Sequence, residues 1–107
     1  MENWKEIEEN NNYLISNLGR FKRNNKILKL NKNARGYLYC NISTDNIITK
    51  VKIHRLVAKA FIDNPKNKET VNHIDCNKLN NNYNNLEWLT RKENIQHYFI
   101  NKNKKSV

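Results

Sequence analysis

Apolar and polar positions alternate along much of the first half of the chain, a pattern typical of β-strands. Short β-branched or aromatic runs, separated by turn residues, lie at 13–16, 26–30, 36–43 and 47–54. The triplet "NLG" predicts a turn in which Gly19 takes a positive φ, and "TDN" at 44–46 predicts a hairpin. We therefore expect residues 13–53 to form a small antiparallel sheet with basic residues on one face.

The apolar period changes to that of a helix at Arg55. In "HRLVAKAFID", Leu56, Val57, Ala60 and Phe61 recur at helical spacing. The following "NPKN" ends this helix, because a proline disfavours helical backbone at the residue before it. A helix therefore follows the predicted sheet directly.

Two short strands and a second helix are predicted beyond that point. "TVNHI" and "LEWLT" have strand character, and the asparagine-rich stretch between them must be mostly loop, since asparagine amides compete with the backbone for hydrogen bonds. Thr90 and Glu93 form a capping box that opens a helix running to about Asn101. The predicted fold class is α+β: a small N-terminal antiparallel β-sheet followed by a helix and a hairpin–helix unit.

These elements predict two modules that share one small core without a linker between them. A chain of 107 residues has room for little more than that. We place the sheet module at residues 1–53 and the module of helix, hairpin and helix at residues 54–101. Residues 102–107 are basic and carry no apolar anchor, so we expect a disordered tail.

The charge of the chain predicts a polyanionic partner. Lysine and arginine total 20 against 10 acidic residues, which gives a net charge of +10 and an isoelectric point near 9.8. Nucleic acid is the usual partner of so basic a small protein, and a merely solvated basic surface is the alternative.

The sequence also predicts an intracellular, cytoplasmic protein. No apolar run approaches the length of a membrane span, and the acidic N-terminus lacks the features of a signal peptide. In a reducing compartment Cys40 and Cys76 are expected to be free thiols. Two isolated cysteines also do not form a zinc site of the paired-cysteine type, so no zinc is expected.

Asparagine occurs 23 times, so an asparagine carries information only where its spacing is defined. His73, Asn85 and Asn94 follow one another at intervals of 12 and 9 residues, across the predicted hairpin and into the last helix. We expect Asn72, Asn85 and Asn94 to be placed for function and most other asparagines to be compositional.

Several motifs carry a resemblance to a known family. "HRLVAKAFI", "VNHIDCNKLNN", "NNLEWLT" and "KEN" resemble the HNH module of phage and intron-encoded homing endonucleases, in which a ββα-metal motif binds one divalent cation. "WKEI", "YLISNLGRFK" and "RGYLYCNI" resemble the modular DNA-binding element that usually precedes that module. Together the resemblances cover nearly all of residues 3–98. They imply a metal-dependent DNA endonuclease that hydrolyses phosphodiester bonds.

The resemblance assigns roles to four residues. His73 matches the general base, Asn94 a metal ligand, and Asn85 the residue that pins the loop and orients the base. Many relatives carry an aspartate as a metal ligand just before the catalytic histidine, where this chain has Asn72. The implied cation is Mg²⁺ or Mn²⁺, bound weakly because both protein ligands are amides.

Each assignment has a plainer alternative. His73 can be a structural histidine, Asn94 a surface residue of the helix, and Asn85 a turn residue whose place Asn84 takes. Asp75 could supply the missing carboxylate. His97 shares a helix face with Asn94, so it could touch the metal or a phosphate, whereas His54 is better interpreted as a structural residue than as a base.

Basic side chains on the predicted sheet and near the helix starts are candidates for DNA contacts, with a solvated face as the alternative. The candidates are Arg20, Lys22, Arg23, Lys26, Lys29, Arg35, Lys52, Arg55, Arg91 and Lys92.

The leading hypothesis is a monomeric HNH-type endonuclease acting on double-stranded DNA. Its rival is a catalytically weakened or inactive DNA-binding protein on the same scaffold, for which Asn72 would be the sign. An RNA-binding protein is a third reading that leaves the spacing of His73, Asn85 and Asn94 unexplained.

Overall fold

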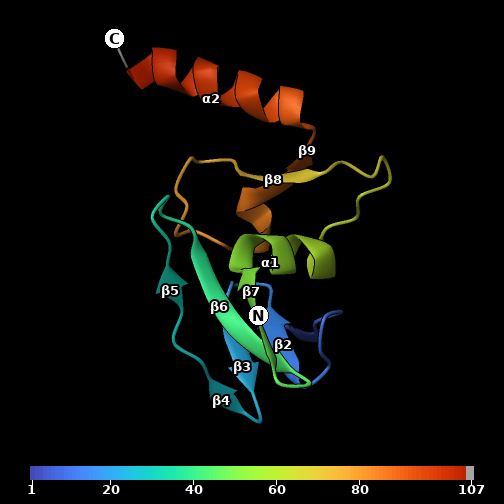
Figure 1. Ribbon diagram of the computed structural model, residues 1–107. Helices are drawn as coiled ribbons and strands as arrows, with labels where there is room; N and C mark the ends of the chain where they lie inside the picture. Colours follow the sequence, from blue (N-terminus) through green and yellow to red (C-terminus); the bar gives the residue numbers. More distant parts are fainter. Residues whose placement is uncertain (106–107) are drawn as a thin grey trace.

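The fold is α+β, as predicted, and α1 lies at its middle (Figure 1). The structure is a computed structural model that describes the backbone of residues 1–105 and the side chains of residues 1–101. In chain order the elements are β1 (Trp4–Glu6), β2 (Tyr13–Ser16), β3 (Phe21–Arg23), β4 (Lys26–Ile27), β5 (Asn31–Lys32), β6 (Leu38–Thr44), β7 (Ile47–Lys52), α1 (Ile53–Phe61), β8 (Thr70–His73), the 3-10 turn η1 (Tyr83–Asn85), β9 (Leu86–Leu89) and α2 (Arg91–Lys105).

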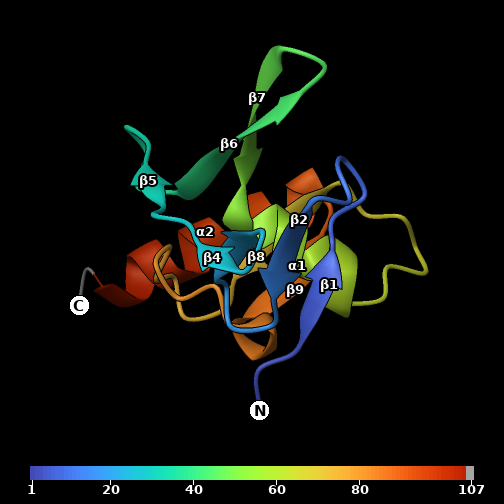
Figure 2. The ribbon, with the colours of Figure 1, turned by 90° about the horizontal axis from the view of Figure 1, so that it is seen from below.

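The strands of the first half form two sheets, so the prediction of one sheet over residues 13–53 is wrong. β1 to β4 make one antiparallel sheet, and β5 to β7 make another, from which the β6–β7 hairpin projects (Figure 2). The predicted strand at 26–30 stops at Ile27. The Leu28 amide still donates to the Phe21 carbonyl at 2.8 Å, and Leu28 and Leu30 pack against the core while Lys29 between them is exposed. The chain then enters the second sheet at β5.

Asparagine shapes several of the tight turns. Asn24 and Asn25 connect β3 to β4 at φ of 50° and 62°, and Asp45 and Asn46 connect β6 to β7 at 51° and 65°. Asparagine and aspartate tolerate this left-handed backbone better than other residues with a β-carbon, and hairpins of two residues require it. The expectation that most asparagines are merely compositional is therefore wrong for these turns.

Helix α1 is buried against both halves of the chain. It contacts β2, β6 and β7 on one side and β8, β9 and η1 on the other. Ile53, Val57 and Ala58 are completely inaccessible to solvent, as are Ile15 and Phe21 of the first sheet. The helix begins at Ile53, two residues before the predicted change of period, so β7 runs into it without a loop.

Helix α2 is longer than predicted. It continues to Lys105, so residues 102–105 are helical rather than disordered, while residues 106–107 lie outside the described residues. No glycine or proline follows Ile100, and lysine is a good helix former. In the part of the chain described, neither helix is long and apolar enough to cross a membrane.

The burial of His54 makes the stability of the fold depend on pH. The side chain, in the first turn of α1, is 6% exposed, and its Nδ1 has no hydrogen-bond partner within the described residues. Burial, followed by the nearby His73, Lys52 and Arg55, lowers its pKa to about 3. The folded protein therefore keeps this ring neutral at pH values where the unfolded chain protonates it.

We predict that acidification destabilises the wild type through His54. As the pH falls from 7 to 5, the unfolded state gains a proton that the folded state does not, which removes about 2 kcal/mol of unfolding free energy. In His54→Phe, which keeps an aromatic ring, this loss of about 2 kcal/mol of unfolding free energy between pH 7 and pH 5 should be absent. Urea unfolding of both proteins at pH 7 and pH 5 measures it. Equal losses in the two proteins would contradict the assignment.

Candidate active site

The asparagine-rich loop joins two strands that pair antiparallel, so its ends are fixed. β8 and β9 pair with His73 opposite Leu86. Beyond the last pair, the Ile74 amide donates to the Asn85 carbonyl at 2.8 Å, and the Cys76 amide donates to the His73 carbonyl at 3.0 Å. The loop between them carries most of the polar contacts of the site.

Asn85 fastens this loop from within. Its Nδ2 donates to Asp75 Oδ1 at 2.8 Å and to the Asn80 carbonyl at 2.9 Å, and its Oδ1 accepts from the Asp75 amide at 3.1 Å. Asn85 is buried, whereas Asn84 beside it is exposed, so Asn85 is the one of the two that holds the loop.

Asp75 is a structural partner of the loop. Its carboxylate accepts from the Asn77 amide at 2.8 Å and from Asn80 Nδ2 at 3.0 Å, besides Asn85. The hydrogen bond from Asn80, followed by those from Asn77 and Asn85, lowers the pKa of Asp75. Its charge is thus used within the loop.

Asn81 is the side chain that contacts the ring of His73 directly. Its Oδ1 lies 2.7 Å from His73 Nε2, and both side chains are buried, at 4% exposure each. A carboxamide oxygen can only accept a hydrogen bond, so this contact requires the proton on Nε2 and leaves Nδ1 as the basic nitrogen. Sequence reasoning missed Asn81, because it stands in a run of three asparagines with nothing to distinguish it.

One face of the His73 ring stacks on a second imidazole. The rings of His73 and His54 lie 5.1 Å apart at 28°, and Tyr37 stacks on His54 at 5.0 Å and 19°. His54 is buried and lies directly against His73. Burial lowers the pKa of His73, against the opposing effect of its hydrogen bond to Asn81, so the ring is neutral at neutral pH.

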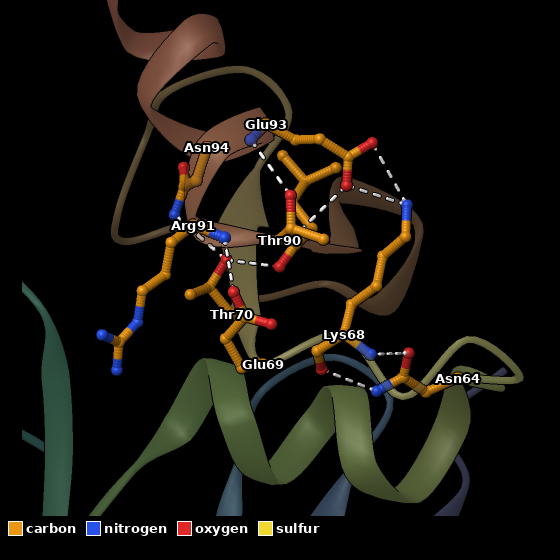
Figure 3. A network of polar contacts seen from close by, with 9 residues as sticks. Asn64, Lys68, Glu69, Thr70, Thr90, Arg91, Glu93 and Asn94 are labelled. Carbon is orange, nitrogen blue, oxygen red and sulfur yellow. Dashed lines mark hydrogen bonds and ion pairs between the residues drawn. The ribbon is translucent and has the colours of Figure 1, made fainter.

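A network of polar contacts fixes the start of α2 (Figure 3). The predicted capping box is present: the Thr90 amide donates to Glu93 Oε1 at 2.9 Å, and the Glu93 amide donates to Thr90 Oγ1 at 3.1 Å. Lys68 pairs with Glu93 at 2.9 Å. The hydrogen bond from the Thr90 amide, followed by the one from Lys68, lowers the pKa of Glu93 to about 2.

The same network orients the amide of Asn94. Its Nδ2 donates to Thr70 Oγ1 at 3.4 Å, and the Thr70 hydroxyl in turn donates to the Leu89 carbonyl at 2.6 Å. With Nδ2 turned toward Thr70, the Oδ1 of Asn94 lies on the opposite side of the amide (Figure 3).

Four of the predicted site residues line one hollow of about 500 Å³. Asn72, His73, Asn94 and His97 all line it, and Lys78 supplies a positive charge. Asn85 and Asp75 are absent from its lining, which contains no acidic side chain among the described residues. His97 is held from its own helix by the Asn101 amide, 3.2 Å from the ring.

The lining suits a hard divalent cation only in part. Amide oxygens from Asn72 and Asn94 are acceptable neutral ligands for Mg²⁺ or Mn²⁺. The Nδ2 of Asn72 is buried without a hydrogen-bond partner in the described structure, so that end of the amide takes no part in the loop network. Among residues 1–105 no group of three or more His, Cys, Asp or Glu is arranged to hold a metal.

The side chains predicted to contact DNA differ in their exposure and in their contacts within the protein. Arg20 is paired with Glu2, and Lys22 lies 4.2 Å from the centre of the Trp4 ring. Arg55 is half-buried and donates to the Glu69 carbonyl at 3.0 Å. The exposed candidates are Arg20, Arg23, Lys26, Lys29, Arg35, Lys52, Arg91 and Lys92. Both cysteines are free thiols.

Comparison with known proteins assigns the two halves to two families. Residues 51–96 match the HNH endonuclease family, and residues 2–43 match the NUMOD4 motif. The chain is 51% identical over 100 residues to the uncharacterized HNH endonuclease L245 of Acanthamoeba polyphaga mimivirus, covering 92% of this chain and 30% of that protein. It is 32% identical over 96 residues to DNA endonuclease I-HmuI of Bacillus phage SP01, covering 87% of this chain and 55% of that protein.

The fold agrees with these matches. A solved structure showing DNA binding and cleavage by the HNH homing endonuclease I-HmuI superposes with a TM-score of 0.85 at 30% identity, over 94% of this chain and 59% of that one. The chain thus spans less than two thirds of the length of these relatives. The sequence matches and the fold therefore support an HNH endonuclease domain at residues 51–96 that follows a NUMOD4 motif at residues 2–43.

Proposed function

We propose that this chain is a metal-dependent DNA endonuclease of the homing type, with His73 as the general base. The observation that carries the proposal is the arrangement of His73 itself. Its Nε2 is taken by Asn81, its ring is neutral, and it lines the same hollow as the amides of Asn72 and Asn94. A neutral imidazole with one free nitrogen can accept a proton from water.

In the proposed reaction, His73 Nδ1 removes a proton from a water molecule as the water oxygen attacks the scissile phosphorus. The bond from phosphorus to the 3′-oxygen breaks, and that oxygen leaves with the electron pair and is protonated from solvent. The buried stack of His54 and Tyr37 holds the base ring in place while this happens. Asn85 acts on the loop rather than on the ring.

A divalent cation would be held by the Oδ1 atoms of Asn72 and Asn94, together with substrate oxygens and water. When bound, it supplies positive charge to the scissile phosphate and the leaving oxygen. Support comes from the hydrogen bond that turns Asn94 Nδ2 toward Thr70 and from the position of both Asn72 and Asn94 in the lining of the hollow. Mg²⁺ and Mn²⁺ are the metals that fit such oxygen donors.

Double-stranded DNA is the proposed substrate, bound by the exposed basic side chains of the two sheets and of the start of α2. The net charge of +10 and the similarity to I-HmuI, a DNA-binding and DNA-cleaving protein, support this choice. We also propose that the protein is a monomer and acts inside the cell.

One observation favours a second candidate, a DNA-binding protein with weakened or absent catalysis. No carboxylate lines the hollow among the described residues, so the cation would be held by neutral groups alone until DNA binds. Incubating plasmid DNA with the protein and Mg²⁺ or Mn²⁺, against an EDTA control, separates the two candidates.

We predict that His73→Ala abolishes cleavage while DNA affinity changes by no more than a few-fold. A general base acts on the water in the transition state, and its loss lowers rates by roughly 10²–10⁴-fold. Cleavage is followed on plasmid DNA and affinity by fluorescence anisotropy in EDTA, with Asn84→Ala, an exposed residue of the same loop, as the matched control. A variant that still cleaves near the wild-type rate removes His73 from the mechanism.

Asn72→Asp should lower the metal concentration needed for half-maximal cleavage. The two side chains have the same shape, but a carboxylate offers the cation a full charge where the amide offers a dipole. Binding of Mn²⁺ to the protein alone, measured by electron paramagnetic resonance, gives a readout independent of cleavage. If neither quantity improves, Asn72 does not hold the cation.

DNA binding should weaken steeply with salt. If about five to eight phosphates are neutralised, log K should fall against log salt with a slope of roughly −4 to −7. The double variant Lys26→Gln/Lys29→Gln should make the slope shallower by about 2, whereas Lys66→Gln, an exposed lysine outside the proposed set, should not. A wild-type slope near zero would mean that the positive charge serves solubility only.

A further inference from the structure

The loop that carries Asn81 is docked on the turn between β2 and β3 in the NUMOD4 motif. The Tyr83 amide donates to the Asn17 carbonyl at 2.8 Å. Asn17 is itself fixed, since its Oδ1 accepts from the Asn3 amide at 2.8 Å and its Nδ2 donates to the Met1 carbonyl at 3.3 Å. The loop therefore docks on a turn whose Asn17 and Gly19 are buried and whose Asn17 is hydrogen-bonded to the start of the chain.

Gly19 is the point of closest approach between the turn and Asn81. A β-carbon at Gly19 would lie 2.8 Å from the Asn81 Cβ and 3.1 Å from the Asn81 carbonyl oxygen. Contacts shorter than 3.0 Å between a β-carbon and a neighbour essentially never occur, so only glycine permits this packing. The φ of +90° at Gly19 also favours glycine, because residues with a β-carbon rarely adopt it.

We propose that Asn81 is a positioning residue that sets which nitrogen of His73 is the base, and that the NUMOD4 turn at Asn17 and Gly19 holds Asn81 in place. This inference rests on the proposed role of His73. It gives the N-terminal module a task beyond DNA binding: the module completes the active site through the loop. A buried acceptor 2.7 Å from Nε2 is what fixes the proton there and frees Nδ1.

The spatial order of the contacts supports the assignment. The turn touches Asn81, Asn81 bonds the Nε2 edge of His73, and His54, backed by Tyr37, stacks on one face of the ring. The ring of His73 is thus held in its plane by stacking and along one edge by a single hydrogen bond. Without Asn81, stacking alone would keep the ring buried but would not choose between the two tautomers.

The test reads the tautomer directly from the ¹⁵N chemical shifts of the His73 ring, in protein without DNA or metal and at a pH where the ring is neutral. We expect a protonated Nε2 and an unprotonated Nδ1 in the wild type. Asn81→Leu, which keeps the branched shape but has no acceptor, should shift both nitrogens toward the values of a tautomer mixture. Asn81→Asp, which retains an acceptor, should restore the wild-type pattern.

A wild-type ring protonated on Nδ1 would overturn the proposal even if no variant folds. An unchanged pattern in folded Asn81→Leu would overturn it as well. In cleavage assays, Asn81→Leu should reduce kcat by roughly 10- to 100-fold with DNA affinity within a few-fold, and Asn81→Asp should recover most of the rate.

The two glycines of the chain offer a matched pair for the second half of the proposal. Gly19 and Gly36 have φ of +90° and +91°, so alanine strains the backbone equally at both. A β-carbon at Gly36 would meet only Lys78 Cδ at 3.5 Å, an ordinary contact. Gly19→Ala should therefore disturb the His73 nitrogen shifts, and Gly36→Ala should leave them as in the wild type.

Equal effects of the two alanine variants would mean that the turn does not act through Asn81. Because the nitrogen shifts are measured without substrate, they decide the role of Asn81 even if the wild-type protein cleaves no DNA. In that case the proposed function fails while the positioning of His73 stands or falls on its own measurement.

Discussion

The burial of α1 between the two halves of the chain is the constraint on which the rest of the structure depends. Nine residues give the helix two occupied sides, one against the N-terminal sheets and one against the β8–β9 hairpin. Because its interior side chains are completely buried, neither half can move away without exposing apolar surface, which costs roughly 25 cal/mol per Å². The helix also places His54 beneath His73. The site is thus held by the core rather than by a separate scaffold.

Asparagine suits the loop above this helix for a physical reason. Each amide offers both donors and an acceptor without a charge, so a chain of amides can satisfy buried polar groups where no helix or strand does. Asn85 uses both ends of its amide, and Asn17 does the same in the turn below. A charged residue in these buried positions would need a partner and would perturb the ionisation of His73. The composition is therefore used by the fold at particular positions, although the sequence alone does not say which.

The parts of the fold that could be predicted are those fixed by local rules. The capping box of Thr90 and Glu93, the hairpin at Asp45 and the positive φ of Gly19 all follow from a few neighbouring residues. The split into two sheets could not be predicted in this way, since it depends on Leu28 and Leu30 packing against a core built by distant segments. For the same reason Asn81 was missed: its partner His73 is eight residues away, and its support comes from Gly19. The family resemblance gave residue roles that residue types alone would have left open.

The absence of a carboxylate from the described lining has a consequence for the order in which the proposed site assembles. With Asn72 and Asn94 as the protein ligands, the charge that a divalent cation needs comes chiefly from the phosphate of the DNA. The cation then binds more tightly once DNA is present, and by thermodynamic reciprocity DNA binds more tightly once the cation is present. Asp75, the carboxylate of the loop, does not supply this charge, because it lies outside the lining of the hollow and accepts hydrogen bonds from Asn77, Asn80 and Asn85. In such a site the metal acts where a phosphate already lies, so the weak protein ligands themselves limit cleavage to properly bound DNA.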